Sequence, residues 1–253
     1  MSMARVYLCT GNCEVRYMNI ALENLLYEMR MKGKNPFLIN INSQPFTSKP
    51  IKTKQREESI PYFEYYTGAE IPSIQYSTLI SLITESRKRK LLVASGESFS
   101  DIIIYGASLP EENIYELSDE LLLLIKKDVS SLSWVYNIAK RISEKKLDRQ
   151  IQIVLIDPKS LEESATFFYN LRNELYSLSG QNIKISFDGF LNIDPDYITA
   201  AINSGKTLIE FVSGGQFHGL VTYILRNMDR NSAEVKREKS FFTRITTLAE
   251  KKQ

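Results

Sequence analysis

The first side chains in this sequence that bear on chemistry follow a short apolar run. Residues 4–9 have the pattern of a buried strand, and the segment after them reads Thr10-Gly11-Asn12-Cys13-Glu14-Val15-Arg16-Tyr17-Met18-Asn19. A loop that cradles phosphates needs several glycines, a lysine for the β and γ oxygens, and a Ser or Thr hydroxyl for Mg²⁺. Only Gly11 meets one of these needs. Taken by itself, the segment is a turn from a strand into a helix.

Other residue types that hold metals or act as nucleophiles are sparse. Cys9 and Cys13 are the only cysteines, and His218 is the only histidine. One such pair without further ligands is a poor metal pattern, so we predict no metal and no cofactor. We expect Cys9 to be a core residue, because free cysteines are commonly buried. We expect His218 to have a packing or capping role in a helix.

Composition points to one globular domain with a well-buried core. The chain has 253 residues, of which 43% are hydrophobic and 25% are charged. The net charge of +2 gives no reason to expect nucleic-acid binding. No apolar run reaches the length of a membrane span, and the N-terminus lacks the organisation of a signal peptide. These features predict a cytoplasmic protein without disulfides.

Short apolar runs alternate with longer amphipathic segments. Strands are predicted at residues 4–9, 36–41, 91–94, 101–105, 120–125, 151–156 and 183–188. Helices are predicted at residues 18–31, 76–85, 130–145, 161–177, 195–204, 214–228 and 239–251, and residues 43–70 as a long surface excursion. This alternation predicts an α/β fold, a mostly parallel β-sheet flanked by helices on both faces, with any ligand crevice at the carboxyl ends of the strands.

The order of these segments, together with several local phrases, resembles the MinD/ParA family of P-loop ATPases over essentially the whole chain. Residues 118–125, SDELLLLI, resemble the family's SDELLLV strand, and residues 193–210 resemble its PEDPAVREAVRRGKPVVE stretch. The resemblance is closest to the FlhG (YlxH/FleN) branch, which controls flagellar number and placement. It implies a MinD-like three-layer P-loop NTPase fold.

The same resemblance places a degenerate nucleotide site at the turn. The family loop has the form GKGGVGKTT, and Gly11 and Val15 fall on its first glycine and its valine. Asn12 replaces the signature lysine that crosses the dimer, and Tyr17 replaces the phosphate-binding lysine. The positions that lose a glycine or a threonine are Cys13, Glu14, Arg16, Met18 and Asn19.

Three acids of the family are also replaced. Asn40 and Asn42 stand where the family phrase LLIDLD supplies carboxylates for Mg²⁺ and the attacking water, and Tyr105 stands at the Walker B acid. Asp157 occupies the place of the asparagine that reads adenine. Without these carboxylates, Mg²⁺ lacks its usual ligands.

The replacements predict a pseudo-ATPase. Glu14 would lie beside triphosphate oxygens, and a like-charge pair at about 4 Å costs about 4 kcal/mol at an effective dielectric near 20. That is a loss of roughly three orders of magnitude in affinity. We therefore expect no ATP hydrolysis and no tight Mg·ATP binding. Asn12 cannot bridge to a partner's phosphates, so nucleotide-switched homodimerisation is not expected either.

The last residues form a basic amphipathic tail, 236–253, after a domain predicted to span residues 1–235. The side chains that could meet a membrane are Lys239, Phe241, Phe242, Arg244, Ile245 and Leu248. One interpretation is a helix that lies on an anionic membrane surface, as in MinD-type proteins. The other is a terminal helix packed on its own domain.

Two further segments have alternative interpretations. Residues 87–90, RKRK, either cap a helix and face solvent, which is the simpler interpretation, or contact nucleic acid or phospholipid. Tyr62, Phe63, Tyr65 and Tyr66 form an aromatic cluster, which is either a protein-binding surface or the part that pins the excursion to the domain.

Three functional hypotheses follow. The leading one is a non-catalytic MinD/FlhG-like regulator or scaffold, which binds flagellar or polar assembly proteins or a MinD/FlhG-like paralogue at the inner face of the cell membrane. The second is a nucleotide-binding ATPase switch with unorthodox phosphate contacts from Asn12 and Arg16. The third is a membrane-surface adaptor that acts through the tail.

Overall fold

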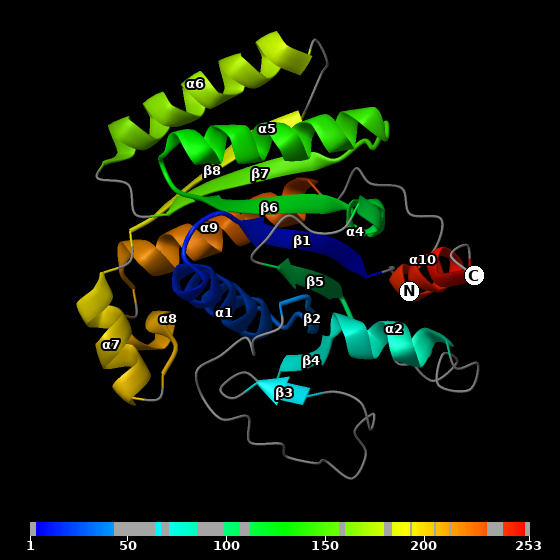
Figure 1. The fold of residues 1–253 in the computed structure, drawn as a ribbon. Helices are drawn as coiled ribbons and strands as arrows, with labels where there is room; N and C mark the ends of the chain where they lie inside the picture. Colours follow the sequence, from blue (N-terminus) through cyan, green and yellow to red (C-terminus); the bar gives the residue numbers. More distant parts are fainter. Residues whose placement is uncertain are drawn as a thin grey trace.

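The fold is built on one large β-sheet. The computed structural model describes residues 4–42, 64–66, 71–84, 99–106, 112–156, 160–179, 184–192, 194–204, 206–212, 214–231 and 240–250. The strands are β1 (Arg5–Gly11), β2 (Pro36–Asn40), β3 (Glu64–Tyr66), β4 (Ile71–Gln75), β5 (Asp101–Gly106), β6 (Glu120–Ile125), β7 (Gln150–Ile156) and β8 (Lys184–Leu191). Their order is β3-β4-β2-β5-β1-β6-β7-β8 (Figure 1). All neighbours pair in parallel except β3 and β4, which confirms the predicted mostly parallel sheet.

Helices cover both faces of this sheet, so the molecule has three layers (Figure 1). The helices are α1 (Val15–Met31), α2 (Tyr76–Thr84), α4 (Glu112–Leu117), α5 (Val129–Glu144), α6 (Leu161–Ser179), α7 (Pro195–Ser204), α8 (Leu208–Phe211), α9 (Gln216–Asn231) and α10 (Phe241–Glu250). Apolar side chains of α2, α4, α5, α6 and α10 pack in the core on one face. Those of α1, α7, α8 and α9 pack in the core on the other face.

The central strand β1 shows why the apolar runs predict the sheet. Val6 and Leu8 face one core, whereas Tyr7 and Cys9 face the other, and none is more than 1% exposed. Because both faces of a parallel sheet are covered, such a strand is a continuous apolar run without alternation. The prediction that Cys9 is a core residue is confirmed, and burial raises the pKa of its thiol.

Some elements differ from the sequence prediction. The predicted excursion, residues 43–70, contains β3, and β4 follows it closely. β4 is not predicted because Pro72 and polar residues interrupt its apolar pattern. The short helices α4 and α8 are not predicted either. Tyr65 and Tyr66 of the aromatic cluster belong to β3, whose backbone pairs with β4 at the edge of the sheet. Residues 62, 63, 87–90 and 91–94 lie outside the described part of the chain.

The C-terminal helix α10 bears on the two interpretations of the tail. Phe241, Phe242 and Ile245 are at most 2% exposed and belong to the main core, where the Phe242 ring lies 6.1 Å from that of Phe37. Arg244 forms an ion pair with Asp119, 3.0 Å away. These side chains therefore pack on the domain itself, as the second interpretation of the tail expects, and the membrane interpretation stays a prediction.

The remaining parts of the tail prediction fall outside the description. Lys239 and the side chain of Leu248 are not described, and neither are residues 232–239, which contain the predicted boundary between domain and tail. In the described residues, no helix combines the length and hydrophobicity that a membrane span requires.

Candidate functional site

The predicted site residues meet at one edge of the sheet. β5 pairs with β1 up to Thr10↔Gly106 and with β2 up to Asn40↔Tyr105, so these three strands end together. The turn after β1, Asn40 and Tyr105 therefore lie at the same carboxyl edge, which is where ligands bind in open α/β sheets.

Gly11 is required for the packing of the sheet. A Cβ on Gly11 would lie 2.2 Å from the carbonyl oxygen of Leu124 in β6. The next residue continues the same pairing, because the backbone N–H of Asn12 donates to that oxygen over 3.2 Å. The glycine and the first N–H of the turn thus serve the contact between β1 and β6.

The side chain of Asn12 connects the turn to the start of α5. Its Nδ2 donates to Ser131 Oγ over 2.8 Å, and Ser131 Oγ in turn donates to Asp128 Oδ1 over 2.9 Å. Asp128 is the N-cap of α5 and also accepts from the Ser131 N–H. Burial would raise the pKa of Asp128, but hydrogen bonds from Ser130 and Ser131 lower it. The turn is therefore held by a polar network within the chain.

An ion pair crosses the turn above this network. Lys126 Nζ lies 2.9 Å from Glu14 Oε1, and the two side chains are 36% and 63% exposed. The hydrogen bond to Glu14 raises the pKa of Lys126. An exposed pair of this kind contributes only about 0–1 kcal/mol. Its significance lies in its position, because a carboxylate occupies the N-terminus of α1, which favours negative charge.

Tyr105 fills the space at the end of β5. Its side chain is fully buried, and its hydroxyl donates to Asn19 Oδ1 of α1 over 2.5 Å. Burial raises the pKa of Tyr105, so the phenol is neutral. Met18 is also fully buried, in the core between α1 and the sheet. Neither residue offers a charged oxygen to a metal ion.

The amide side chains of Asn40 and Gln75 bond to each other and to the backbone of Asn42 at the ends of β2 and β4. Asn40 is 1% exposed, and its Oδ1 accepts from the Asn42 N–H over 3.0 Å. With the Gln75 amide oriented to suit its neighbours, its nitrogen donates to the carbonyl oxygens of Asn40 and Asn42, 3.1 and 3.2 Å away. The Gln75 oxygen then accepts from Asn40 Nδ2 over 3.2 Å. This cluster is uncharged and lies where the resemblance puts two acids.

The rest of the turn is partly open to solvent. Arg16 is exposed, Val15 is 46% exposed, and Tyr17 is half-buried against the core of its face. Cys13 is buried, and burial raises the pKa of its thiol to about 12. Arg16 is therefore the exposed cation in the first turn of α1.

Sequence reasoning missed several members of the site. Ser131 and Asp128 are not predicted, although an Asp three residues before a Ser at the start of an amphipathic segment is an N-cap pattern. Gln75 is missed because β4 is missed. Lys126 carries no local signal, since its partner is 112 residues away. Asp157 lies outside the described residues.

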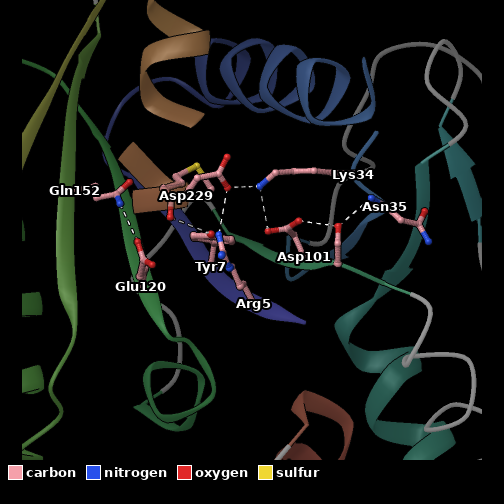
Figure 2. A network of polar contacts seen from close by, with 10 residues as sticks. Arg5, Tyr7, Lys34, Asn35, Asp101, Glu120, Gln152 and Asp229 are labelled. Carbon is pink, nitrogen blue, oxygen red and sulfur yellow. Dashed lines mark hydrogen bonds and ion pairs between the residues drawn. The ribbon is translucent and has the colours of Figure 1, made fainter. Parts of the chain in front are cut away.

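The opposite, amino edge of the sheet carries a second polar network (Figure 2). Asp229 of α9 pairs with Arg5 at 3.2 Å and with Lys34 at 2.5 Å, and Lys34 lies 3.6 Å from Asp101. Farther along, Gln152 donates to Glu120 over 2.8 Å. This network ties the end of α9 to the strands. His218, in the same helix, lies 3.3 Å from Glu28 of α1, consistent with its predicted packing role.

Among the described residues, no three His, Cys, Asp or Glu side chains are grouped to hold a metal ion. The site is thus a turn, three strand ends and a helix start, joined by neutral hydrogen bonds and one surface ion pair.

This arrangement, a strand–turn–helix unit at the centre of a parallel sheet, is that of a P-loop NTPase fold. The chain is similar to a ParA family ATPase from Chlorobium tepidum TLS, with a TM-score of 0.60 and 15% identity over 88% of this chain and 98% of that one. It is similar to the MinD cell division protein of Aquifex aeolicus, with a TM-score of 0.58 and 13% identity over 93% and 100%. It is also similar to McdA from Cyanothece, solved as an ATP complex, with a TM-score of 0.58 and 11% identity over 95% of this chain and 100% of that one.

The sequence comparisons add no closer relative. No protein-family model matches the chain, and no curated protein matches it either. The structural comparisons nevertheless extend over the full length of the other chains, so the protein has the MinD/ParA-type P-loop NTPase fold.

Proposed function

We propose that this chain is a non-catalytic MinD/ParA-like protein that works by binding protein partners. The observation that carries the proposal is that its own side chains occupy the edge where a P-loop ATPase would hold Mg·ATP. Asn12 is bonded to Ser131, Glu14 to Lys126, and Tyr105 to Asn19.

The loss of phosphate contacts supports this proposal. A phosphate cradle requires free backbone N–H groups and cations at the turn. Here the N–H of Asn12 is used by Leu124, and those of Tyr17 and Met18 donate to the Glu14 carbonyl. The exposed carboxylate of Glu14 adds a negative charge at the same place.

The loss of metal contacts supports it as well. Mg²⁺ prefers carboxylate oxygens and water. The three positions that would supply them hold Asn40, Asn42 and Tyr105, whose polar groups are used within the chain. To bind there, Mg²⁺ would have to replace these buried hydrogen bonds, and the side chains offer no carboxylate charge that would offset their loss.

A carboxyl edge of the sheet that is held by contacts within the chain suits a protein that presents the same binding surface at all times. In a switch, the nucleotide changes which state is populated, and a protein without that ligand stays in the state its own contacts select. A structural neighbour is the MinC:MinD cell division protein complex of Aquifex aeolicus, and another is pNOB8 ParA bound to nonspecific DNA. We favour a protein partner because the net charge of this chain is only +2.

Within this proposal, a flagellar or polar assembly role rests on the FlhG-like phrases of the sequence. Affinity capture from the native cell tests the flagellar or polar assembly role, and flagellar export and basal-body proteins are the expected partners. Recovery of partition or division proteins in their place would reassign the process and leave the non-catalytic proposal intact.

The central test is a calorimetric titration with Mg·ATP and Mg·ADP. We expect no saturable heat and no phosphate release above buffer, whereas an intact ParA-type ATPase run in parallel gives both. Saturation in the low-micromolar range would overturn the proposal.

One feature favours the alternative, a switch with unorthodox phosphate contacts. Arg16 is an exposed cation in the first turn of α1, a position that attracts anions. The same titration with Arg16→Gln separates the two hypotheses. Binding that is present in the unmodified chain and lost in this variant would support the alternative.

A further inference from the structure

Two arginines meet at the amino edge of the sheet, away from the turn after β1. Glu120 of β6 is paired with Gln150 of β7, so the residues that precede them, Asp119 and Arg149, are neighbours. Arg244 reaches the same place from α10, with its Nη1 3.0 Å from Asp119 Oδ1. We refer to Arg149, Arg244 and Asp119 as the amino-edge cluster.

The acids near this cluster are already engaged. Asp119 Oδ2 accepts a hydrogen bond from the N–H of Val6 over 2.9 Å, and its Oδ1 accepts one from Arg244 Nη1. Asp148 lies 2.9 Å from the exposed Lys184. Burial and the repulsion from Arg244 lower the pKa of Arg149, against the attraction of Asp119. The cluster itself therefore has two guanidinium groups and one carboxylate.

Several N–H groups of the two arginines lack a partner within the described protein. Arg149 Nε, Arg244 Nε and Arg244 Nη2 are buried and make no hydrogen bond. Buried donors are nearly always satisfied, by the protein, by ordered water or by a ligand. Three unsatisfied donors on two neighbouring cations have a clear chemical complement. That complement is an anion with several acceptor oxygens.

We propose that Arg149 and Arg244 form a binding site for a phosphate group. Guanidinium N–H groups bind phosphate oxygens in charge-assisted, often paired hydrogen bonds. Asp119 orients Arg244 through its Oδ1 and leaves Nε and Nη2 of that side chain for the ligand. The cluster lies near the surface, because the Arg244 side chain is 20% exposed and Arg149 is only half-buried, so a ligand reaches the three buried donors by a small shift of these side chains. The phosphate belongs to a free ion or small metabolite, or to a lipid headgroup.

The experiment uses inorganic phosphate on the full chain, with chloride at the same ionic strength as reference. Arg149→Gln is the main variant, since Arg149 is not the residue that pairs with Asp119 at 3.0 Å. Lys184→Gln is the matched control, because it removes one positive charge from the same edge at an exposed pair. Affinity comes from calorimetry and from the shift in melting temperature.

We expect Arg149→Gln to weaken phosphate binding by about 10- to 100-fold, the usual effect of losing a charged hydrogen-bond partner. Lys184→Gln should stay within about threefold of the unmodified chain, as for an exposed charge. Arg149→Lys should restore only part of the affinity, because an ammonium lacks the planar fork. Circular dichroism of each variant checks that the fold is kept.

A second arm distinguishes the source of the phosphate. Flotation with vesicles of phosphatidylcholine and phosphatidic acid tests the headgroup, with phosphatidylcholine alone as control. Binding of free phosphate or of these vesicles that is lost in Arg149→Gln and kept in Lys184→Gln supports the site. No response to either probe in the unmodified chain overturns it, and so does an equal loss in both variants.

Discussion

The hydroxyl of Tyr105 donates to Asn19 over 2.5 Å and joins the end of β5 to the first turns of α1. The two residues are 86 positions apart in the sequence. In the family that this chain resembles, one position carries the Walker B acid and the other a threonine of the phosphate loop. If this resemblance holds residue by residue, two positions of the family's nucleotide site contact each other directly in this chain.

The first prediction concerns this hydrogen bond. Tyr105→Phe keeps the ring and leaves Asn19 Oδ1 without this donor, so we expect the free energy of unfolding to fall by about 1 kcal/mol. Urea denaturation measures the change. Tyr223→Phe is the control, because Tyr223 is 46% exposed and should change stability very little. Equal effects of the two variants would show that the contact adds no net stability.

The second prediction concerns Gly11. An added Cβ would meet the Leu124 carbonyl at 2.2 Å, so β1 and β6 must move apart in Gly11→Ala. We expect a loss of about 1–3 kcal/mol or more in the free energy of unfolding, as for overpacked cores. A Cβ on Gly219 in α9 would meet no atom within 4 Å outside the neighbouring residues and backbone of its own helix, among the described residues. Gly219→Ala should therefore raise stability, by up to about 1 kcal/mol. Opposite signs for the two variants, measured by urea denaturation, are the expected result.

The third prediction concerns α10. Phe242 is 2% exposed and packs edge-on against Phe241, 5.1 Å between ring centroids. Phe242→Ala should lower the free energy of unfolding by about 3–5 kcal/mol, the usual range for a buried phenylalanine. The measurement is urea denaturation without lipid. A neutral effect on folding, combined with weaker vesicle binding, would instead favour the membrane interpretation of this helix.

The fourth prediction concerns the pH dependence of stability. Asp188 of β8 is 1% exposed, and burial raises its pKa from 3.8 to about 6, although hydrogen bonds from Ser186 and Asn227 oppose the shift. Between these two values the folded chain holds a proton that the unfolded chain has lost. The Asp188 contribution to the free energy of unfolding is therefore largest below the unfolded pKa and decreases as the pH rises to about 6.

Asp188→Asn should remove this dependence, since an amide does not titrate. At a pH near 7.5 the variant should be more stable than the unmodified chain, by an amount on the order of 3 kcal/mol. The difference should shrink as the pH falls toward about 4. Urea denaturation at several pH values gives the comparison. A constant difference between the two proteins at all pH values would contradict the assigned pKa.

The sequence by itself determined the fold class and most of the elements. Residues 120–125 and 151–156 are apolar runs because strands in the middle of a parallel sheet are covered on both faces. The α1 and α5 helices follow from the spacing of their apolar residues. The strand β4, which lies between β2 and the edge strand β3, is not predicted because Pro72 and polar side chains weaken its local pattern.

The tertiary structure decided what the candidate site is made of. Asn12 and Ser131, 119 residues apart, meet only because β1 and β6 are neighbours in the sheet. No local pattern of hydrophobicity encodes such a contact, since it depends on which strands pair and in which register. The same reason applies to α10. Its amphipathic sequence fits a membrane or a protein core equally well, and only the tertiary structure brings Phe242 against Phe37 in the core.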